Sequence, residues 1–337
     1  MRTLLADLIA GALLLAVTAY STAGGVDFGA GIWDLLAGRG KRADAARELI
    51  DHAMAPVWEV NNVWLVLAIV ICWTGFPPLF QATFLNLYPL FTLALIGLIL
   101  RGAFFAFRHI AGNPRERRIA NLVFGISSVL TPFFFAACLG AIASGKVAME
   151  PKLPVWQVCL SPMPFAFGLV SLGATALSGA SFLVGDARRH APDLVDYFRR
   201  RAVAAALFLI VLGTLALAVI GVQRRELLVA MFTTLGLPFA LATMVLTPVV
   251  AVLLWRRVFV LYRVLTVGVV GSLVAAWGLA QSPYLLPGQL TIDQAAAPAS
   301  TEALLVVIAA GVLLVIGPAI GLLIYLDQRS LLESPKA

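Results

Sequence analysis

The sequence predicts an all-α integral membrane protein that crosses the bilayer about nine times. The chain of 337 residues is 61% hydrophobic and only 12% charged, whereas soluble domains carry about 25% charged residues. Its mean hydropathy is +0.97. The apolar residues also gather in runs of about 20, the length that a helix needs to span a bilayer. No stretch between these runs is long enough for a soluble domain, so we expect a single membrane domain over residues 1–337.

The expected spans follow one another in order along the chain. We place them at about 4–24, 60–78, 81–105, 119–143, 160–184, 202–222, 227–254, 258–280 and 303–326. No charged residue appears from Leu8 to Val26, and the first helix could also continue to residue 36. A polar, Ala-rich segment at 281–302 precedes the last span. Pro132, Pro238, Pro248 and Pro318 fall inside spans and predict kinks.

Basic residues concentrate in alternate loops, and this asymmetry orients the chain. Four loops hold Arg39, Lys41, Arg42 and Arg47; then Arg108, Arg115, Arg117 and Arg118; then Arg188, Arg189, Arg199, Arg200 and Arg201; and then Arg256, Arg257 and Arg263. The loops between them hold only Lys146, Lys152, Arg224 and Arg225. The positive-inside rule places the first group in the cytoplasm. The N-terminus is then outside and the C-terminus cytoplasmic, and the net charge of +7 reflects topology rather than nucleic-acid binding.

Three charged residues are expected at membrane depth, where a charge costs about 2.5–3.5 kcal/mol at a helix centre. Asp27 follows the first span, Glu59 opens the second, and Arg101 lies near the inner end of the third. The topology places all three towards the cytoplasmic side. Because a buried arginine strongly prefers a carboxylate partner, we predict a carboxylate–arginine cluster.

Two interpretations of these charges stay open. Each side chain could instead extend to the membrane interface, where its charge is solvated. Asn61 and Asn62 continue a polar strip beside Glu59 and favour a functional role for that residue. The glycines around Asp27 indicate close helix packing, since no phosphate-binding glycine motif is present.

The histidines argue against a redox centre in this chain. A membrane haem normally takes a histidine ligand, and His52, His109 and His190 are all expected in cytoplasmic loops or at their edges. The three cysteines form no CxxC pair, so no metal site is expected. Neither HExxH nor GxSxG occurs. We therefore expect no catalytic residue in this chain by itself.

Several motifs together resemble subunit II of cytochrome bd quinol oxidase. They are GVDFGAG at 25–31, APVWE at 55–59, NNVWL at 61–65, FP at 76–77, LILRG at 98–102, FR at 107–108, WGLAQSPYLLP at 277–287 and LTI at 290–292. Their order and spacing, the chain length and the span count agree with that family.

The resemblance implies two four-helix bundles plus a peripheral helix in a bacterial cytoplasmic (inner) membrane. It implies a haem-free subunit beside a subunit I that carries haems b and d. That complex oxidises quinol and reduces oxygen to water with protons from the cytoplasm. Small accessory subunits and a quinone held as a structural lipid are further features of some members.

The resemblance also gives roles to single residues. Glu59 matches a position in proton delivery, Asp27 a weaker candidate for it, and Trp64 the entrance of an oxygen path. Arg101 matches a structural charge partner, and Trp58 and Asn61 belong to the motif. Gly24 stands where the family often has a second acidic residue, which favours Glu59 over Asp27. The alternative to this family is a cation-coupled secondary transporter with kinked helices and membrane carboxylates.

Overall fold

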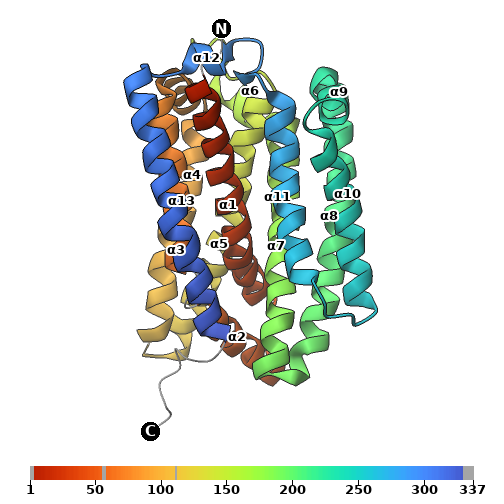
Figure 1. Cartoon of the computed structure of the whole chain (residues 1–337). Coiled ribbons are helices and arrows are strands. Elements are labelled where there is room, and N and C mark those ends of the chain that lie inside the picture. Colours follow the sequence, from red (N-terminus) through yellow and green to blue (C-terminus); the bar gives the residue numbers. More distant parts are fainter. Residues whose placement is uncertain (1–3, 55–57, 111, 329–337) are drawn as a thin grey trace.

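The computed structural model describes residues 4–54, 58–110 and 112–328. Long helices run side by side along one axis and form an elongated bundle (Figure 1). The first half contains α1 (Leu4–Leu35), α2 (Lys41–Met54), α3 (Trp58–Val70), the π-helical turn η1 (Ile71–Gly75), α4 (Pro77–Ile110), α5 (Pro114–Ala143) and α6 (Val155–Cys159). The second half contains α7 (Pro162–His190), the 3₁₀ turn η2 (Pro192–Leu194), α8 (Val195–Gln223), α9 (Arg225–Thr233), α10 (Leu237–Trp255), α11 (Tyr262–Gln281), β1 (Tyr284–Leu286), β2 (Leu290–Thr291), α12 (Ile292–Ala295) and α13 (Ala299–Gln328).

Seven helical segments in the described residues are long and apolar enough to cross a membrane. They are α1, α4, α5, α7, α8 with η2, α10 and α11. The predicted spans 60–78 and 303–326 fall on shorter apolar segments, Asn61–Gly75 and Ala299–Val315. The prediction of a mainly helical, multi-pass membrane protein is confirmed, and the count of nine spans stays a prediction.

Helix starts follow local sequence rules. Proline opens α4, α5 and α7 at Pro77, Pro114 and Pro162, where its fixed φ suits the first turn and its missing N–H is not needed. Asn113 caps α5, since its side chain accepts a hydrogen bond from the backbone N–H of Glu116 at 2.9 Å. The first helix takes the longer of the two courses that the sequence left open, so Asp27 lies inside α1 rather than after it.

The prediction of one helix over 227–254 is wrong. The chain forms the short helix α9 and then α10, with Thr234 extended between them at φ −113° and ψ −160°. Gly236 lets the chain after this break approach α11 closely, because a Cβ there would lie 3.0 Å from the Ala276 carbonyl oxygen. Pro238 then lies in the first turn of α10 and starts that helix instead of kinking it. Pro132, Pro248 and Pro318 do lie inside helices, as predicted.

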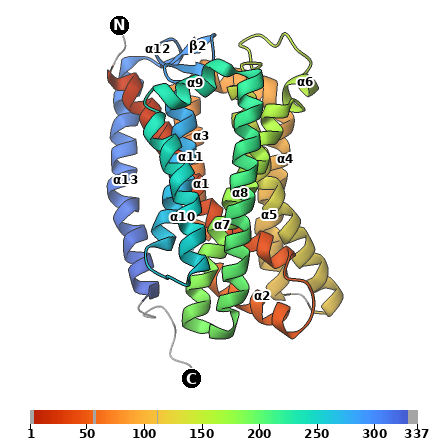
Figure 2. The same ribbon diagram turned by 90° about the vertical axis from the view of Figure 1, so that its right-hand side faces the viewer.

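The packing order places α1 at the centre, against α3, α5, α7 and α11. On one side α4 packs on α5, on the other α8 packs on α7 and α10, and α13 lies against α1 and η1 at the edge (Figures 1 and 2). The end of the bundle that carries α2 also receives the four Arg-rich loops, whereas α6, α9, α12 and the β1–β2 hairpin cover the opposite end. The basic loops therefore share one end, as their alternation requires.

Candidate functional site

Asp27 and Arg101 form a buried ion pair between α1 and α4. The Arg101 Nη2 atom lies 2.5 Å from the Asp27 carboxylate Oδ1 and 3.0 Å from the Asp27 carbonyl oxygen. Its Nη1 atom donates to the Ser128 hydroxyl of α5 at 2.7 Å. Asp27 is 3% exposed and Arg101 is 1% exposed, so neither side chain reaches the interface. The predicted pairing of Asp27 with Arg101 is therefore present in the structure, whereas the Glu59 side chain of the same predicted cluster lies outside the described residues.

Glycines let the helices approach closely enough to bury this pair. A Cβ on Gly31 would meet the Ser128 hydroxyl at 2.1 Å and the Arg101 Nη1 atom at 3.2 Å. A Cβ on Gly29 would meet the Thr175 carbonyl oxygen of α7 at 2.1 Å. The α1 backbone therefore touches α7 directly, which confirms close packing as the purpose of the glycine run.

A second set of ion pairs lies about two helical turns further along α1 and α4. The Arg108 Nη1 atom is 2.8 Å from one carboxylate oxygen of Asp34, and the Arg47 Nε atom is 3.0 Å from the other. Arg108 also pairs with Asp51 of α2. Asp34 is 2% exposed and Arg108 is 5% exposed. This set ties α1, α2 and α4 together at the end of the bundle where α2 lies (Figure 1).

The two sets repeat with the same spacing. Asp34 follows Asp27 by seven residues on α1, and Arg108 follows Arg101 by seven residues on α4, which in each case is about two helical turns. The ring of Phe124, fully buried on α5, lies 4.7 Å from the Arg101 guanidinium and 4.4 Å from that of Arg108. We call these residues the charge ladder, with an inner rung at Asp27–Arg101 and an outer rung at Asp34–Arg108. The outer rung was not predicted, although the shared spacing of seven was a signal for it.

The predicted Glu59 side chain, and that of Trp58, lie outside the described residues. Their backbone opens α3, which packs against α1. Asn61, two residues further on, is 2% exposed, and its amide Nδ2 atom lies 3.0 Å from where a Cβ on Gly24 would be. The structure thus joins Asp27 with Arg101 and places the start of α3 against the same helix.

Trp64 lies further along α3 than Asn61, in an apolar part of the bundle. It is 8% exposed, and with Ala12, Leu67 and Ala309 it lines a small apolar cavity between α1, α3 and α13.

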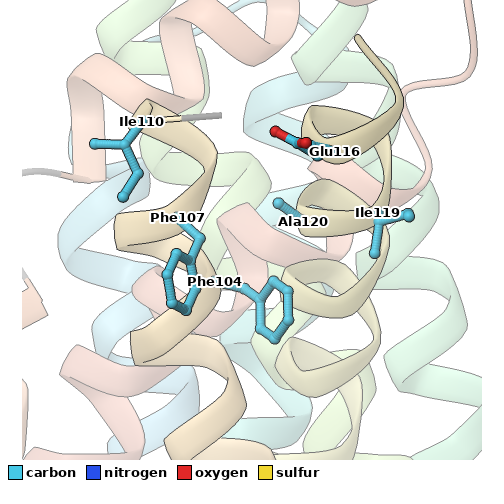
Figure 3. A pocket seen from close by; sticks show the side chains of 6 residues that line it. All are labelled: Phe104, Phe107, Ile110, Glu116, Ile119 and Ala120. Atoms are coloured by element: carbon cyan, nitrogen blue, oxygen red, sulfur yellow. The ribbon is translucent and has the colours of Figure 1, made fainter. Parts of the chain in front are cut away.

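A larger cavity of about 370 Å³ opens between α4 and α5 (Figure 3). It is lined by Phe104, Phe107, Ile110, Glu116, Ile119 and Ala120. Glu116 accepts hydrogen bonds there from the Asn113 amide at 2.6 Å and the Gly112 N–H at 3.2 Å, so its carboxylate secures the α4–α5 turn.

The described histidines lie at the α2 end of the bundle, not between the membrane helices. His52 of α2 and His190 at the end of α7 have ring centroids 4.9 Å apart. The side chain of His109 is outside the described residues. Within the described residues, no three His, Cys, Asp or Glu side chains come together to hold a metal ion.

These features define a class: a multi-pass helical membrane protein with buried ion pairs at the end that carries its basic loops. The family model of cytochrome bd terminal oxidase subunit II matches residues 5–326, and the chain therefore belongs to that family. The structure resembles the bd oxidase from Geobacillus thermodenitrificans, with a TM-score of 0.83 and 23% identity over 96% of this chain and 99% of that one. At that identity the likeness concerns the fold.

Curated relatives agree with the family. The chain is 27% identical over 217 residues to cytochrome bd-I ubiquinol oxidase subunit 2 of Escherichia coli K12, covering 63% of this chain and 54% of the relative. It is 28% identical over 174 residues to the putative cytochrome bd menaquinol oxidase subunit II of Bacillus subtilis, covering 50% and 48%. The chain thus spans about half the length of the curated relatives it matches.

Proposed function

We propose that this chain is the haem-free subunit II of a bd-type terminal quinol oxidase in a bacterial cytoplasmic membrane. It works beside a subunit I that carries haems b and d, where quinol is oxidised and oxygen is reduced to water. The observation that carries this proposal is the family match over residues 5–326, which takes in every membrane helix of the bundle. Nine spans in two four-helix bundles plus a peripheral helix, an outside N-terminus and a cytoplasmic C-terminus belong to the same proposal.

Within this proposal the charge ladder holds the helices together, and Glu59 carries protons from the cytoplasm. A proton on Asp27 would neutralise the carboxylate that lies 2.5 Å from Arg101, and this would leave a buried guanidinium without a counter-charge. That cost supports a structural role for the inner rung. Glu59 lies in the first turn of α3, which packs against α1, and its proton role rests on the motif that it shares with the family.

Trp64 is proposed as part of an oxygen path. Oxygen is small and apolar, and the cavity beside Trp64 is lined by apolar side chains only. A structural quinone and small accessory subunits remain compatible with this function, and the exposed apolar faces of the helices are suited to lipid.

The transporter alternative has less support. Transporter sites are typically formed by broken helices near the middle of the membrane. The break between α9 and α10 lies instead towards the end of the bundle that also carries α12 (Figure 1). The family match favours the oxidase subunit.

Copurification from the native membrane tests the proposal. We expect a larger haem protein to accompany this chain, with b- and d-type bands in the reduced-minus-oxidised spectrum. A colourless protein that is stable alone and transports a solute would contradict the oxidase function and favour the transporter.

Glu59→Gln tests the proton role within the complex. We expect slower quinol oxidation with unchanged haem bands, because the amide cannot carry a proton while the fold is kept. Val66→Ala serves as the control, because Val66 is an exposed apolar residue on the same helix. Normal activity and normal haem content in Glu59→Gln and Glu59→Ala would refute proton delivery through this residue.

A further inference from the structure

Two arginines outside the charge ladder share one aromatic ring. The guanidinium carbon of Arg201 on α8 lies 3.4 Å from the centroid of the Tyr197 ring, and that of Arg42 on α2 lies 5.1 Å from it. Arg201 also lies 5.8 Å from the Trp33 ring of α1. Tyr197 is buried, and its hydroxyl reaches the Ala37 carbonyl oxygen at 3.5 Å. Side chains from α1, α2 and α8 thus surround the two guanidinium groups of Arg42 and Arg201.

Neither guanidinium has a carboxylate partner among the residues that the structure describes. Several carboxylates on the same helices are bound to other arginines: Asp34 to Arg47 and Arg108, Asp44 to Arg47, Asp51 to Arg108, and Asp196 to Arg199 and Arg257. Two cations on one ring repel each other, so an anion between them would stabilise the arrangement. Arginine suits phosphate in particular, because its planar fork binds phosphate oxygens in pairs while its face stacks on an aromatic ring.

The surface next to Arg201 indicates which phosphate compound fits. Ala204, Phe208, Val211 and Leu215 follow Arg201 at helical spacing on one face of α8. Ala204 is exposed, and Phe208, Val211 and Leu215 are 52%, 54% and 58% exposed. α8 lies on the outside of the bundle, facing the viewer in Figure 2. The charged site therefore continues directly into an apolar strip along the membrane-facing side.

We propose that Arg42 and Arg201 bind the phosphate of an anionic phospholipid headgroup, with an acyl chain along the Ala204–Leu215 face of α8. The site lies at the end of the bundle that carries α2, where a headgroup would meet the helix ends (Figures 1 and 2). A free phosphate would use the two arginines but not the apolar strip. Basic pockets between membrane helices are known to take such headgroups.

The test uses the full chain in the complex in which it is isolated. The complex is reconstituted in phosphatidylcholine bilayers with and without phosphatidylglycerol. We measure the phosphatidylglycerol that remains bound and the rise in Tm that it causes. The wild type should retain phosphatidylglycerol. Arg42→Gln and Arg201→Gln should each weaken its binding about fivefold, and the double variant about 25-fold.

Arg256→Gln is the matched control, because Arg256 is an exposed arginine in the loop between α10 and α11, and that loop lies towards the same end of the bundle (Figure 1). Its binding should equal that of the wild type. Each variant is compared with itself in the two bilayers, so a general loss of stability cancels. Equal weakening in Arg256→Gln would show a diffuse surface charge and overturn the proposal. Inorganic phosphate added to phosphatidylcholine bilayers should cause no rise in Tm; the same rise as phosphatidylglycerol would overturn the lipid assignment.

Discussion

In its first half α4 carries a row of aromatic rings that stack on one another, whereas in its second half it carries two buried guanidinium groups that pair with other helices. The rings of Phe80, Phe84 and Phe91 follow one another at centroid distances of 4.2 and 4.6 Å. Ten residues after Phe91, which is about three helical turns, the charge ladder begins at Arg101. Both halves belong to one apolar helix, yet only the second uses ions to fix its neighbours.

The two halves of α4 differ in how much stability is lost when one side chain of a contact is removed. An aromatic contact contributes dispersion and ring packing, which decline gradually as atoms are removed. A buried charge is tolerated only while its partner is present, so removing one member leaves an uncompensated ion. We therefore expect the two halves of α4 to differ most in their response to single substitutions.

The largest effect is expected at the inner rung. Asp27→Ala should destabilise the protein by about 3–5 kcal/mol, because Arg101 would remain buried without a carboxylate. Thermal unfolding of the purified protein in detergent measures the loss. The charge-free pair Asp27→Leu with Arg101→Met should recover most of the stability. A double variant as unstable as the single one would show that the ion pair itself, rather than its disruption, determines stability.

The next largest effect should come from the helix contact that buries this rung. Gly29→Ala places a methyl group 2.1 Å from the Thr175 carbonyl oxygen, and such overpacking costs about 1–3 kcal/mol. Gly11→Ala on the same helix is the control, since no atom lies within 4 Å of its added Cβ. Unfolding temperatures should fall for Gly29→Ala only. Equal temperatures for the two variants would contradict direct contact between α1 and α7.

The outer rung should be less sensitive than the inner rung. Arg108→Gln leaves Asp34 with Arg47 at 3.0 Å, so we expect a loss of only about 1–2 kcal/mol. Arg101→Gln leaves Asp27 with no other cation in the described residues and should cost more. Comparing the two variants by thermal unfolding separates the rungs. A greater loss for Arg108→Gln would reverse the order proposed for the ladder.

The smallest effect is expected in the aromatic half of α4. Phe84→Leu keeps an apolar side chain of similar volume and should cost about 0.5–1.5 kcal/mol through lost ring stacking. Tyr88→Leu provides the comparison, because Tyr88 is 57% exposed on the same helix. A loss at Phe84 as large as that at Asp27 would remove the distinction between the two halves.

Much of the membrane architecture could be predicted from the sequence. Apolar run length and the alternation of basic loops are local properties, since each helix must satisfy its own backbone in lipid. The pairing of Asp27 with Arg101 also followed from depth, because the rise per residue places both at one level. The break between α9 and α10 did not follow, since Thr234 and Gly236 lie in a run whose hydropathy continues without interruption.

What the sequence determined by itself was therefore the membrane class, the order of the helices and the level of the charges. Only the tertiary structure decided which charges meet. In the sequence Arg108 belongs to a basic loop. In the structure it pairs with Asp34 of α1 and Asp51 of α2. The same holds for Arg42 and Arg201, which are far apart in the chain and share Tyr197. The physical reason is that helical periodicity fixes the face of a side chain, whereas its partner depends on how separate helices pack.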